Sequence, residues 1–219
     1  MINQSLINPK SIVVVGASND LHKPGGKVLK NILEGGYKGE LFAVNPRQTS
    51  VQGIDCVRSV DELDSVELAI ISIPAKFCPA IVETLARQKD TRAFIVLSAG
   101  FSEETGQGRA WEEEITATVN SVGGCLLGPN CIGVLNGNYH GVFTTPIPTI
   151  EATGCDLISS SGATAVFLLE AGMMLGLKFS SVVSVGNSAQ VGIEEVLEHM
   201  DENFDAKTGS RTKLLYLES

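Results

Sequence analysis

The chain has 219 residues and a net charge of −9, with 43% hydrophobic, 19% charged and only 5% aromatic residues. This length allows one or two domains, and the composition is too apolar for a disordered protein. Residues 1–100 hold 11 basic against 10 acidic side chains and residues 101–219 hold 5 against 15. An extended basic face is therefore missing, and we expect no nucleic-acid partner.

Strands and helices alternate over the first 127 residues. Short β-branched runs predict buried strands, and helical spacing such as that of Ile81, Val82, Leu85 and Ala86 predicts helices between them. This alternation predicts an α/β fold with parallel strands, right-handed crossovers and a sheet covered on both faces. The predicted strands are residues 11–15, 41–44, 68–73, 93–97 and 124–127, and the predicted helices are residues 27–34, 77–88 and 105–120.

Residues 136–154 break the pattern, because they are rich in Gly, Thr and Pro and have no helical period. We place a domain boundary there, which gives domains of residues 1–145 and 146–219. A second alternation follows, with strands at 155–159, 180–185 and 213–217 and helices at 162–175 and 192–203. Three strands alone would leave an unpaired edge strand, so we expect that the chain is a fragment of a longer protein or a naturally shortened relative of one.

The cellular setting follows from the cysteines and from the absence of long apolar runs. The five cysteines are odd in number and lack CxxC spacing, which favours a reducing compartment over a disulfide framework. No apolar run reaches the length of a membrane span, and residues 1–10 do not resemble a signal peptide. We expect a cytoplasmic protein with no membrane partner.

The loop after the first predicted strand is a candidate phosphate site. It holds Gly16, Ser18, Asn19, Asp20 and Lys23, and ligands of open parallel sheets bind beyond the carboxyl ends of strands. Small residues let backbone N–H groups approach a phosphate at the start of the next helix. The GxGxxG pattern fails because a serine replaces the second glycine, and a plain strand-to-helix turn is the alternative interpretation.

The loop after the second predicted strand reads Asn45-Pro46-Arg47. An NAD-binding domain would have an acidic residue here for the ribose hydroxyl. Arg47 instead suits a phosphorylated ribose, as in NADP or coenzyme A, although a solvated loop arginine is the alternative.

Two further loops complete the predicted ligand edge. Pro74 ends its strand at the rim of the sheet, and the small Ala75 leaves room for a flat ring or a thin chain. Plain strand termination is the alternative there. Ser98 and Ala99 follow the next strand, and Ser102 is a predicted helix N-cap.

Short segments along the chain resemble one family. They are VVVGAS at 13–18, IPAKFC at 73–78, GPNCIG at 128–133, SSSGA at 159–163 and SVGN at 184–187. Together they are similar to the α-subunit of succinyl-CoA synthetase and closer still to NDP-forming acyl-CoA synthetases, such as ADP-forming acetyl-CoA synthetase. The resemblance runs from Ser5 to Glu218, and the pair GPNC and SSSGA at this separation is its most specific part.

The resemblance implies a Rossmann-like CoA-binding domain followed by an incomplete flavodoxin-like α/β domain. It implies that acyl-CoA, phosphate and NDP give a carboxylic acid, CoA and NTP, by way of an acyl phosphate and a phosphohistidine. It also implies CoA or acyl-CoA and a small carboxylic acid as ligands. An ATP-grasp domain or subunit, outside this sequence, would bind ADP or GDP with Mg²⁺. A homo- or hetero-oligomer is expected.

The resemblance also assigns residues, position by position. The CoA phosphates would lie at Ser18, Asn19 and Asp20, with Gly16 and Lys23 in the same loop, and the 3′-phosphate would be flanked by Asn45, Pro46 and Arg47. The adenine and pantetheine path would be lined by Pro74, Ala75, Ser98 and Ala99. The thiol end would lie near Asn130 and Cys131. Ser161, Gly162 and Ala163 would bind phosphate at the start of their helix, where Ser161 could equally be an N-cap. Succinyl-CoA synthetase has a lysine where this chain has Gln48, so Arg47 must supply the charge.

The catalytic equipment of the family is incomplete in this sequence. Glu218 matches the acid that orients the phosphohistidine, but the segment that would carry this histidine is absent, and His22, His140 and His199 do not replace it. Cys131 matches a position that is not a nucleophile, and we expect it to be inert. We therefore expect no full turnover from this chain alone and no metal site. The alternatives are a CoA-sensing or regulatory module, such as the ligase-like part of a protein acetyltransferase, and an NADP-dependent oxidoreductase.

Overall fold

Two β-sheets organise the chain, and the computed structural model describes residues 2–104, 106–207 and 209–218. The first sheet contains β1 (Ser11–Val15), β2 (Glu40–Val44), β3 (Ser50–Val51), β4 (Ile54–Val57), β5 (Leu68–Ile71), β6 (Ala93–Val96) and β7 (Cys125–Leu127); the second contains β8 (Gly133–Leu135), β9 (His140–Val142), β10 (Ile150–Ser159), β11 (Phe179–Ser184) and β12 (Thr212–Tyr216). The helices are α1 (Gln4–Ile7), α2 (Pro24–Glu34), α3 (Cys78–Gln88), α4 (Gly106–Ser121), α5 (Gly162–Met174) and α6 (Ile193–Glu202), with the 3-10 turns η1 (Val60–Glu62) and η2 (Ala75–Phe77).

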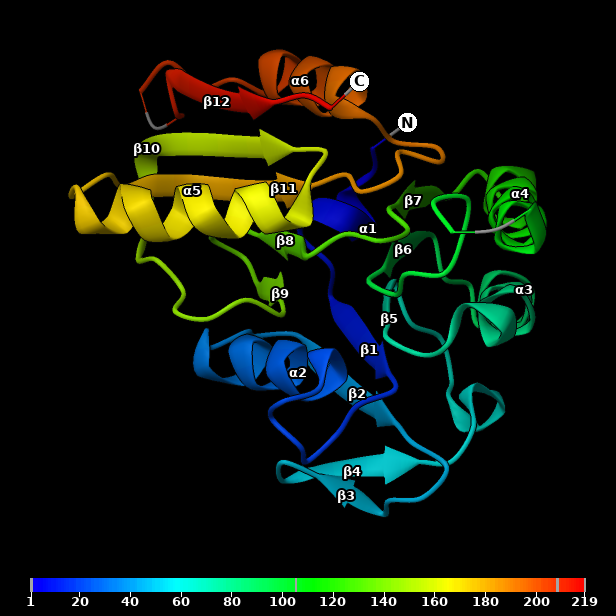
Figure 1. Ribbon diagram of the computed structural model, residues 1–219. Coiled ribbons are helices and arrows are strands. Elements are labelled where there is room, and N and C mark those ends of the chain that lie inside the picture. Colours follow the sequence, from blue (N-terminus) through cyan, green and yellow to red (C-terminus); the bar gives the residue numbers. More distant parts are fainter. Residues whose placement is uncertain (1, 105, 208, 219) are drawn as a thin grey trace.

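The first sheet has the order β3-β4-β2-β1-β5-β6-β7, and its strands from β4 to β7 are parallel (Figure 1). Every residue of β1 is buried, because both faces of the strand are covered. Ile12 and Val14 pack with α2 on one face, and Val13 and Val15 pack with α3 and α4 on the other. The predicted parallel α/β sheet is confirmed.

The second sheet has five strands, in the order β12-β10-β11-β8-β9. β10, β11 and β12 are parallel, as predicted, and lie between α5 on one face and α6 on the other. The antiparallel hairpin β8–β9 comes from the segment in which no element is predicted, and it pairs with β11. The prediction of a three-stranded sheet is therefore wrong. The boundary between residues 145 and 146 stays a prediction, with two of the five strands lying ahead of it.

Several element boundaries differ from those predicted. α2 begins at Pro24, because proline is well suited to the first helical position. β10 begins at Ile150 and continues through a register shift before Cys155. Ser102 does not cap α4: its hydroxyl donates to Glu112, and the predicted first residue of that helix, Thr105, lies outside the described residues. None of the helices in the described ranges has the length and apolar character that crossing a membrane requires.

The short helix α1 joins the two sheets. Leu6 is buried, and its carbonyl oxygen accepts a hydrogen bond of 2.7 Å from the Tyr139 hydroxyl beside β9. Asn136 and Asn138 donate to the carbonyl of Ile7, and the Asn3 amide donates to the carbonyl of Arg92, next to β6. The first residues of the chain therefore hold the β8–β9 hairpin against the first sheet.

Tyr139→Phe is expected to lower the free energy of unfolding by about 1–2 kcal/mol, since the buried carbonyl of Leu6 would lose its partner. Urea denaturation followed by circular dichroism measures this. Tyr216→Phe is the matched control, because the hydroxyl of Tyr216 bonds to nothing within the described part of the chain. Equal stability of the two variants would contradict the role given to Tyr139.

Candidate functional site

The loops that follow five parallel strands meet at one edge of the first sheet, where hydrogen bonds join each loop to a neighbour. The Asn45 amide donates to the carbonyl of Ala17 at 2.7 Å. The Ser98 hydroxyl donates to the carbonyl of Ile73, and the Asn130 N–H donates to the carbonyl of Ser98 at 2.9 Å. The predicted loops therefore lie in the strand order β2-β1-β5-β6-β7, over four strand spacings, or roughly 19 Å. An extended ligand fits such an arrangement.

The loop after β1 is built for close approach by backbone. Gly16 has φ +87°, and a Cβ there would overlap the carbonyl oxygen of Ser72. Cβ atoms on Gly25 and Gly26 would overlap the carbonyls of Gly16 and Asp20, so these glycines let the start of α2 pack directly on the loop. Within the described ranges, the N–H groups at positions 17, 18 and 19 donate no hydrogen bond.

This donor set fits the phosphate groups of CoA. The free N–H groups lie beside the amino end of α2, which favours an anion. Lys23, at the N-cap, is exposed, and no described acidic side chain pairs with it. Arg47 is also exposed, its backbone N–H is held by the Asn45 side chain at 2.9 Å, and no acceptor among the described residues takes its guanidinium. Both cations are therefore available to a ligand.

The β3–β4 hairpin supports the same loop and was not predicted. Gln52 donates from its side chain to the carbonyls of Ser18 and Gly26, and from its backbone to the Asn19 side chain at 2.8 Å. Asn19 thus holds the hairpin, so its predicted contact with a phosphate would have to come from its backbone. The signal was present in the Gln52-Gly53 turn between two apolar residues.

The middle of the edge exposes apolar side chains. Ala75 is buried and Pro74 and Ala99 are exposed. Phe77, predicted only as the start of a helix, is 53% exposed, and the ammonium of Lys76 lies 4.9 Å from its ring centroid. An aromatic face beside a cation can stack a planar ring. Phe77 is not among the predicted ligand residues, because it stands where the loop passes into the predicted helix and no sequence pattern shows which way its ring faces.

Asn130 and Cys131 lie at the far end of the edge, after β7. Asn130 has φ +58° and is exposed, whereas Cys131 is 2% exposed and donates from Sγ to the carbonyl of Val96. Burial raises the pKa of the Cys131 thiol to about 12. A protonated, covered sulfur is a poor nucleophile, which agrees with the expectation that Cys131 is inert.

Alkylation tests this arrangement. Iodoacetamide at pH 8 is expected to label Cys131 only after unfolding, since a raised pKa leaves almost no thiolate at that pH. Cys56, which is only partly buried, is expected to react first. Peptide mass spectrometry over a time course measures both. Early labelling of Cys131 in the folded protein would contradict its burial.

The predicted phosphate loop lies directly against the loop after β7. The Ile132 N–H donates to the Ser184 hydroxyl at 3.2 Å. A Cβ on Gly162 would lie 3.0 Å from Cγ2 of Ile132, so Ile132 packs on the first residue of α5. Ser161 is the N-cap of that helix, and its Oγ accepts from the N–H of Thr164. The predicted position of the CoA thiol, near Asn130, and the predicted phosphate site, at Ser161, are therefore neighbours.

Glu218 comes close to the same loop through its backbone. Its N–H donates to the Ser160 hydroxyl at 2.9 Å, and the Ser160 N–H donates to the carbonyl of Tyr216. The side chain is exposed. The three histidines belong to other places: His22 to the loop after β1, His140 to β9 and His199 to α6.

Asn187, in the loop after β11 of the second sheet, bonds to loops of the first sheet at this site. Its side-chain amide donates to the carboxylates of Glu103 and Glu112 at 2.5 and 2.8 Å and accepts from the Asn130 amide at 3.3 Å. Burial works to raise the pKa of Glu103, but hydrogen bonds from Asn187 and from the loop backbone lower it below its ordinary value. Gly186 has φ +56°, and a Cβ there would overlap the carbonyl of Pro129. Residues 184–187 therefore contact both the loop after β6 and the loop after β7 and hold them together.

Known proteins match both halves of the chain. A model of the CoA binding domain matches residues 10–137, and a model of the succinyl-CoA ligase-like flavodoxin domain matches residues 152–219. Acetate–CoA ligase [ADP-forming] I of Archaeoglobus fulgidus is 36% identical and aligns with 90% of this chain and 28% of its own length. The alpha subunit of acetate–CoA ligase [ADP-forming] I of Pyrococcus furiosus is 34% identical, over 98% of this chain and 46% of its own length.

Solved structures agree with these matches. An acetyl-coenzyme A synthetase 1 of Candidatus Korarchaeum cryptofilum, in complex with phosphate and ADP, superimposes with a TM-score of 0.88 at 31% identity. The superposition covers 99% of this chain and 45% of that one. The chain thus spans less than half the length of these relatives. Among the described residues, no three His, Cys, Asp or Glu side chains gather as a metal site requires.

Proposed function

The chain belongs to the CoA binding domain family and is homologous to the alpha-subunit portion of ADP-forming acyl-CoA synthetases, and from this premise we propose that it binds CoA or acyl-CoA within such an enzyme. The enzyme would interconvert acyl-CoA, phosphate and NDP with a small carboxylic acid, CoA and NTP. This chain would supply the thioester site and the phosphate loop.

One observation carries the proposal: the loop after β7 packs on the first residue of α5. A ligand bound along the first sheet, with its reactive end at Asn130, would end beside Ser161. Phosphate bound at the start of α5 would then lie next to that reactive end. Bringing the two reactants together in this way removes much of the entropic barrier to their reaction.

Each group of residues has a separate task in this proposal. Arg47 binds the 3′-phosphate, while Lys23 and the free N–H groups after Gly16 bind the diphosphate. Ala75, Ala99 and the Phe77 ring line the path between the two ends. CoA, when bound, supplies the thiol that carries the acyl group. Ser161, Gly162 and Ala163 hold the phosphate, and Glu218 accepts a hydrogen bond from the incoming histidine.

The histidine would come from a further segment of the ligase-like domain, outside this sequence. An ATP-grasp domain or subunit would bind the nucleotide with its Mg²⁺. The outer face of α5 supports such a partner, because Phe167 and Met174 on it are 68% and 88% exposed, and Leu175 after it is 88% exposed. Large apolar side chains exposed together on one side of a helix mark an interaction site. The five unpaired cysteines favour a reducing compartment such as the cytoplasm.

Phe167→Glu tests the partner surface. It is expected to abolish co-elution of this chain with an ATP-grasp subunit in size-exclusion chromatography, because a charge would replace the largest exposed ring on α5. Glu113→Gln, an exposed residue of α4, is the control and should co-elute normally. Co-elution of the Phe167 variant at wild-type level would place the partner elsewhere.

Isothermal titration of the purified chain tests the function itself. CoA is expected to bind and NADP is not, since the first sheet carries no recognisable hydride-transfer site. Binding of NADP alone would overturn the proposal in favour of an oxidoreductase. Absence of binding by either ligand would show that this chain by itself does not form the site.

A further inference from the structure

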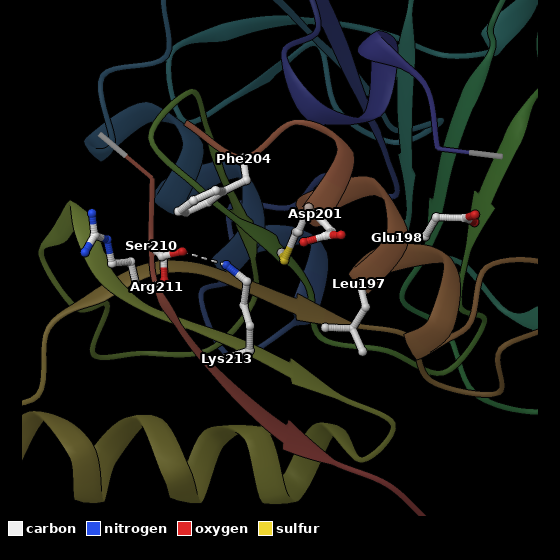
Figure 2. A pocket seen from close by; sticks show the side chains of 8 residues that line it. Leu197, Glu198, Asp201, Phe204, Ser210, Arg211 and Lys213 are labelled. Atoms are coloured by element: carbon white, nitrogen blue, oxygen red, sulfur yellow. Dashed lines mark hydrogen bonds between the residues drawn. The ribbon is translucent and has the colours of Figure 1, made fainter. Parts of the chain in front are cut away.

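A separate cavity lies under α6, away from the loops described above. It occupies about 560 Å³ between the carboxyl half of α6 and the second sheet, with α1 closing one side. A neighbouring hollow of about 530 Å³ opens between α6 and β12 and shares Met200, Phe204, Ser210 and Lys213 with it (Figure 2). Sizes of this order are typical of small-molecule sites.

The floor of the cavity is a polar row across three neighbouring strands. The strand register places Asp156 of β10 directly between Ser181 of β11 and Lys213 of β12. The Ser181 hydroxyl donates to one carboxylate oxygen of Asp156 at 2.6 Å, and the Lys213 ammonium donates to the other. Asp156 is only 5% exposed, whereas Ser181 and Lys213 are partly buried, so the centre of the row is the part that is shielded from solvent.

Much of the cavity wall is apolar, although Asn136, Asn203 and Asp205 also line it. Leu6, Val183, Val196, Met200 and Phe204 contribute to the apolar part. A buried ion pair does not stabilise a fold better than apolar residues of similar size would, so packing alone does not account for a charged floor here. An apolar cavity with a few convergent polar groups is the usual form of a ligand site.

Two of these polar groups, Lys213 and His199, offer donors to a ligand. The Lys213 ammonium has three N–H groups, and its bonds to Asp156 and to the carbonyl of Ser210 occupy two of them. Figure 2 shows Lys213 reaching from β12 toward α6 with the bond to Ser210. The amide of Asn203 lies 3.4 Å from Nδ1 of His199. In the tautomer that accepts this bond, Nε2 of His199 carries a proton and is a second donor.

We propose that this cavity is a binding site for a monocarboxylate with an apolar chain or ring. The carboxylate accepts from the free N–H of Lys213, with His199 as the second donor in reach of the cavity. The apolar body lies against Val196 and Met200. Asp205 on the cavity wall, with Glu198 and Asp201 exposed in the neighbouring hollow (Figure 2), opposes a second negative charge, which limits the ligand to one carboxylate. This site is independent of the CoA proposal.

Methyl NMR on the full chain tests the site, with hexanoate and hexylamine as probes. Hexanoate is expected to shift the Met200 methyl signal saturably and to leave those of Met173 and Met174, which belong to α5 on the opposite face of the sheet, unchanged. Hexylamine should cause no shift at the same concentrations. An unmoved Met200 signal, or equal binding of hexylamine, would overturn the proposal.

Two variants locate the binding. In Asp156→Asn/Lys213→Met both charges are removed together, so neither is left buried and unpaired, and hexanoate is expected to bind at least tenfold more weakly. Ala152→Trp should close the cavity and abolish binding without disturbing the core, because Ala152 is an exposed lining residue. Ala110→Trp on α4 is the control. Hexanoate binding that survives Ala152→Trp would refute the site even if the double variant did not fold.

Discussion

Arg47→Ala is expected to weaken CoA binding roughly ten- to 150-fold, which corresponds to the loss of a charge-assisted hydrogen bond of about 1.5–3 kcal/mol. The guanidinium is exposed and bonded to no described residue, so its removal should cost the fold nothing. The whole effect should therefore appear in the titration with CoA and not in the thermal unfolding midpoint.

A matched ligand separates the role of Arg47 from a general loss of positive charge. 3′-Dephospho-CoA lacks only the phosphate assigned to Arg47, so wild type and Arg47→Ala should bind it with similar affinity. Arg87→Ala is the control variant, because Arg87 pairs with Glu83 near the end of α3 that lies away from the loops. An equal loss for CoA and dephospho-CoA would move the 3′-phosphate away from Arg47.

Gly16→Ala is expected to lower stability by about 3 kcal/mol or more, because it combines a strained positive φ with a methyl group driven into the backbone of the neighbouring loop. For a chain of this size this corresponds to a fall of roughly 10 °C in the unfolding midpoint. CoA affinity should fall with it, since the free N–H groups at positions 17–19 depend on this turn for their direction.

Gly53→Ala separates the stability cost of backbone strain from the cost of steric overlap. Gly53 has φ +84°, close to the +87° of Gly16, but a Cβ there would meet nothing within 4 Å. Its alanine variant should therefore lose only the strain, about 1–2 kcal/mol. Differential scanning calorimetry compares the two. If both variants lost the same stability, the close contact between Gly16 and Ser72 would not contribute to the destabilisation by Gly16→Ala.

The sequence predicted the strands that are covered on both faces. It did not predict the short hairpins β3–β4 and β8–β9 or the short helix α1. β1, β5 and β6 are buried apolar runs, and periodicity alone finds them. The hairpins β3–β4 and β8–β9 are short, and glycines at positions 53, 133 and 141 interrupt or flank them, so neither produces a clear period. α1 has four residues and is stabilised by tertiary hydrogen bonds, which no local pattern reveals.

The candidate site divides in a similar way. Loop positions such as Gly16, Arg47 and Ser161 follow directly from the ends of predicted strands, and the structure places them at the carboxyl ends of those strands. The bonds of Gln52 to the first loop and of Asn187 to Glu103 and Glu112 join residues far apart in the chain. The first pairing depends on how the β3–β4 hairpin folds back along the first sheet and the second on how the two sheets meet, and no local sequence pattern reveals either.

The hydrogen bond from Tyr139 to Leu6 joins residues 133 positions apart, and this has a consequence for synthesis on the ribosome. At the usual speed of translation, the beginning of the chain waits on the order of ten seconds for its partner. Until then the carbonyl of Leu6 lacks the Tyr139 hydroxyl, and Asn31 of α2 lacks the carbonyls of Val142 and Thr144 that it bonds in the finished protein. A recombinant piece that stops at residue 137 would lack these partners permanently. Expression of the CoA-binding half alone should therefore extend beyond Thr144.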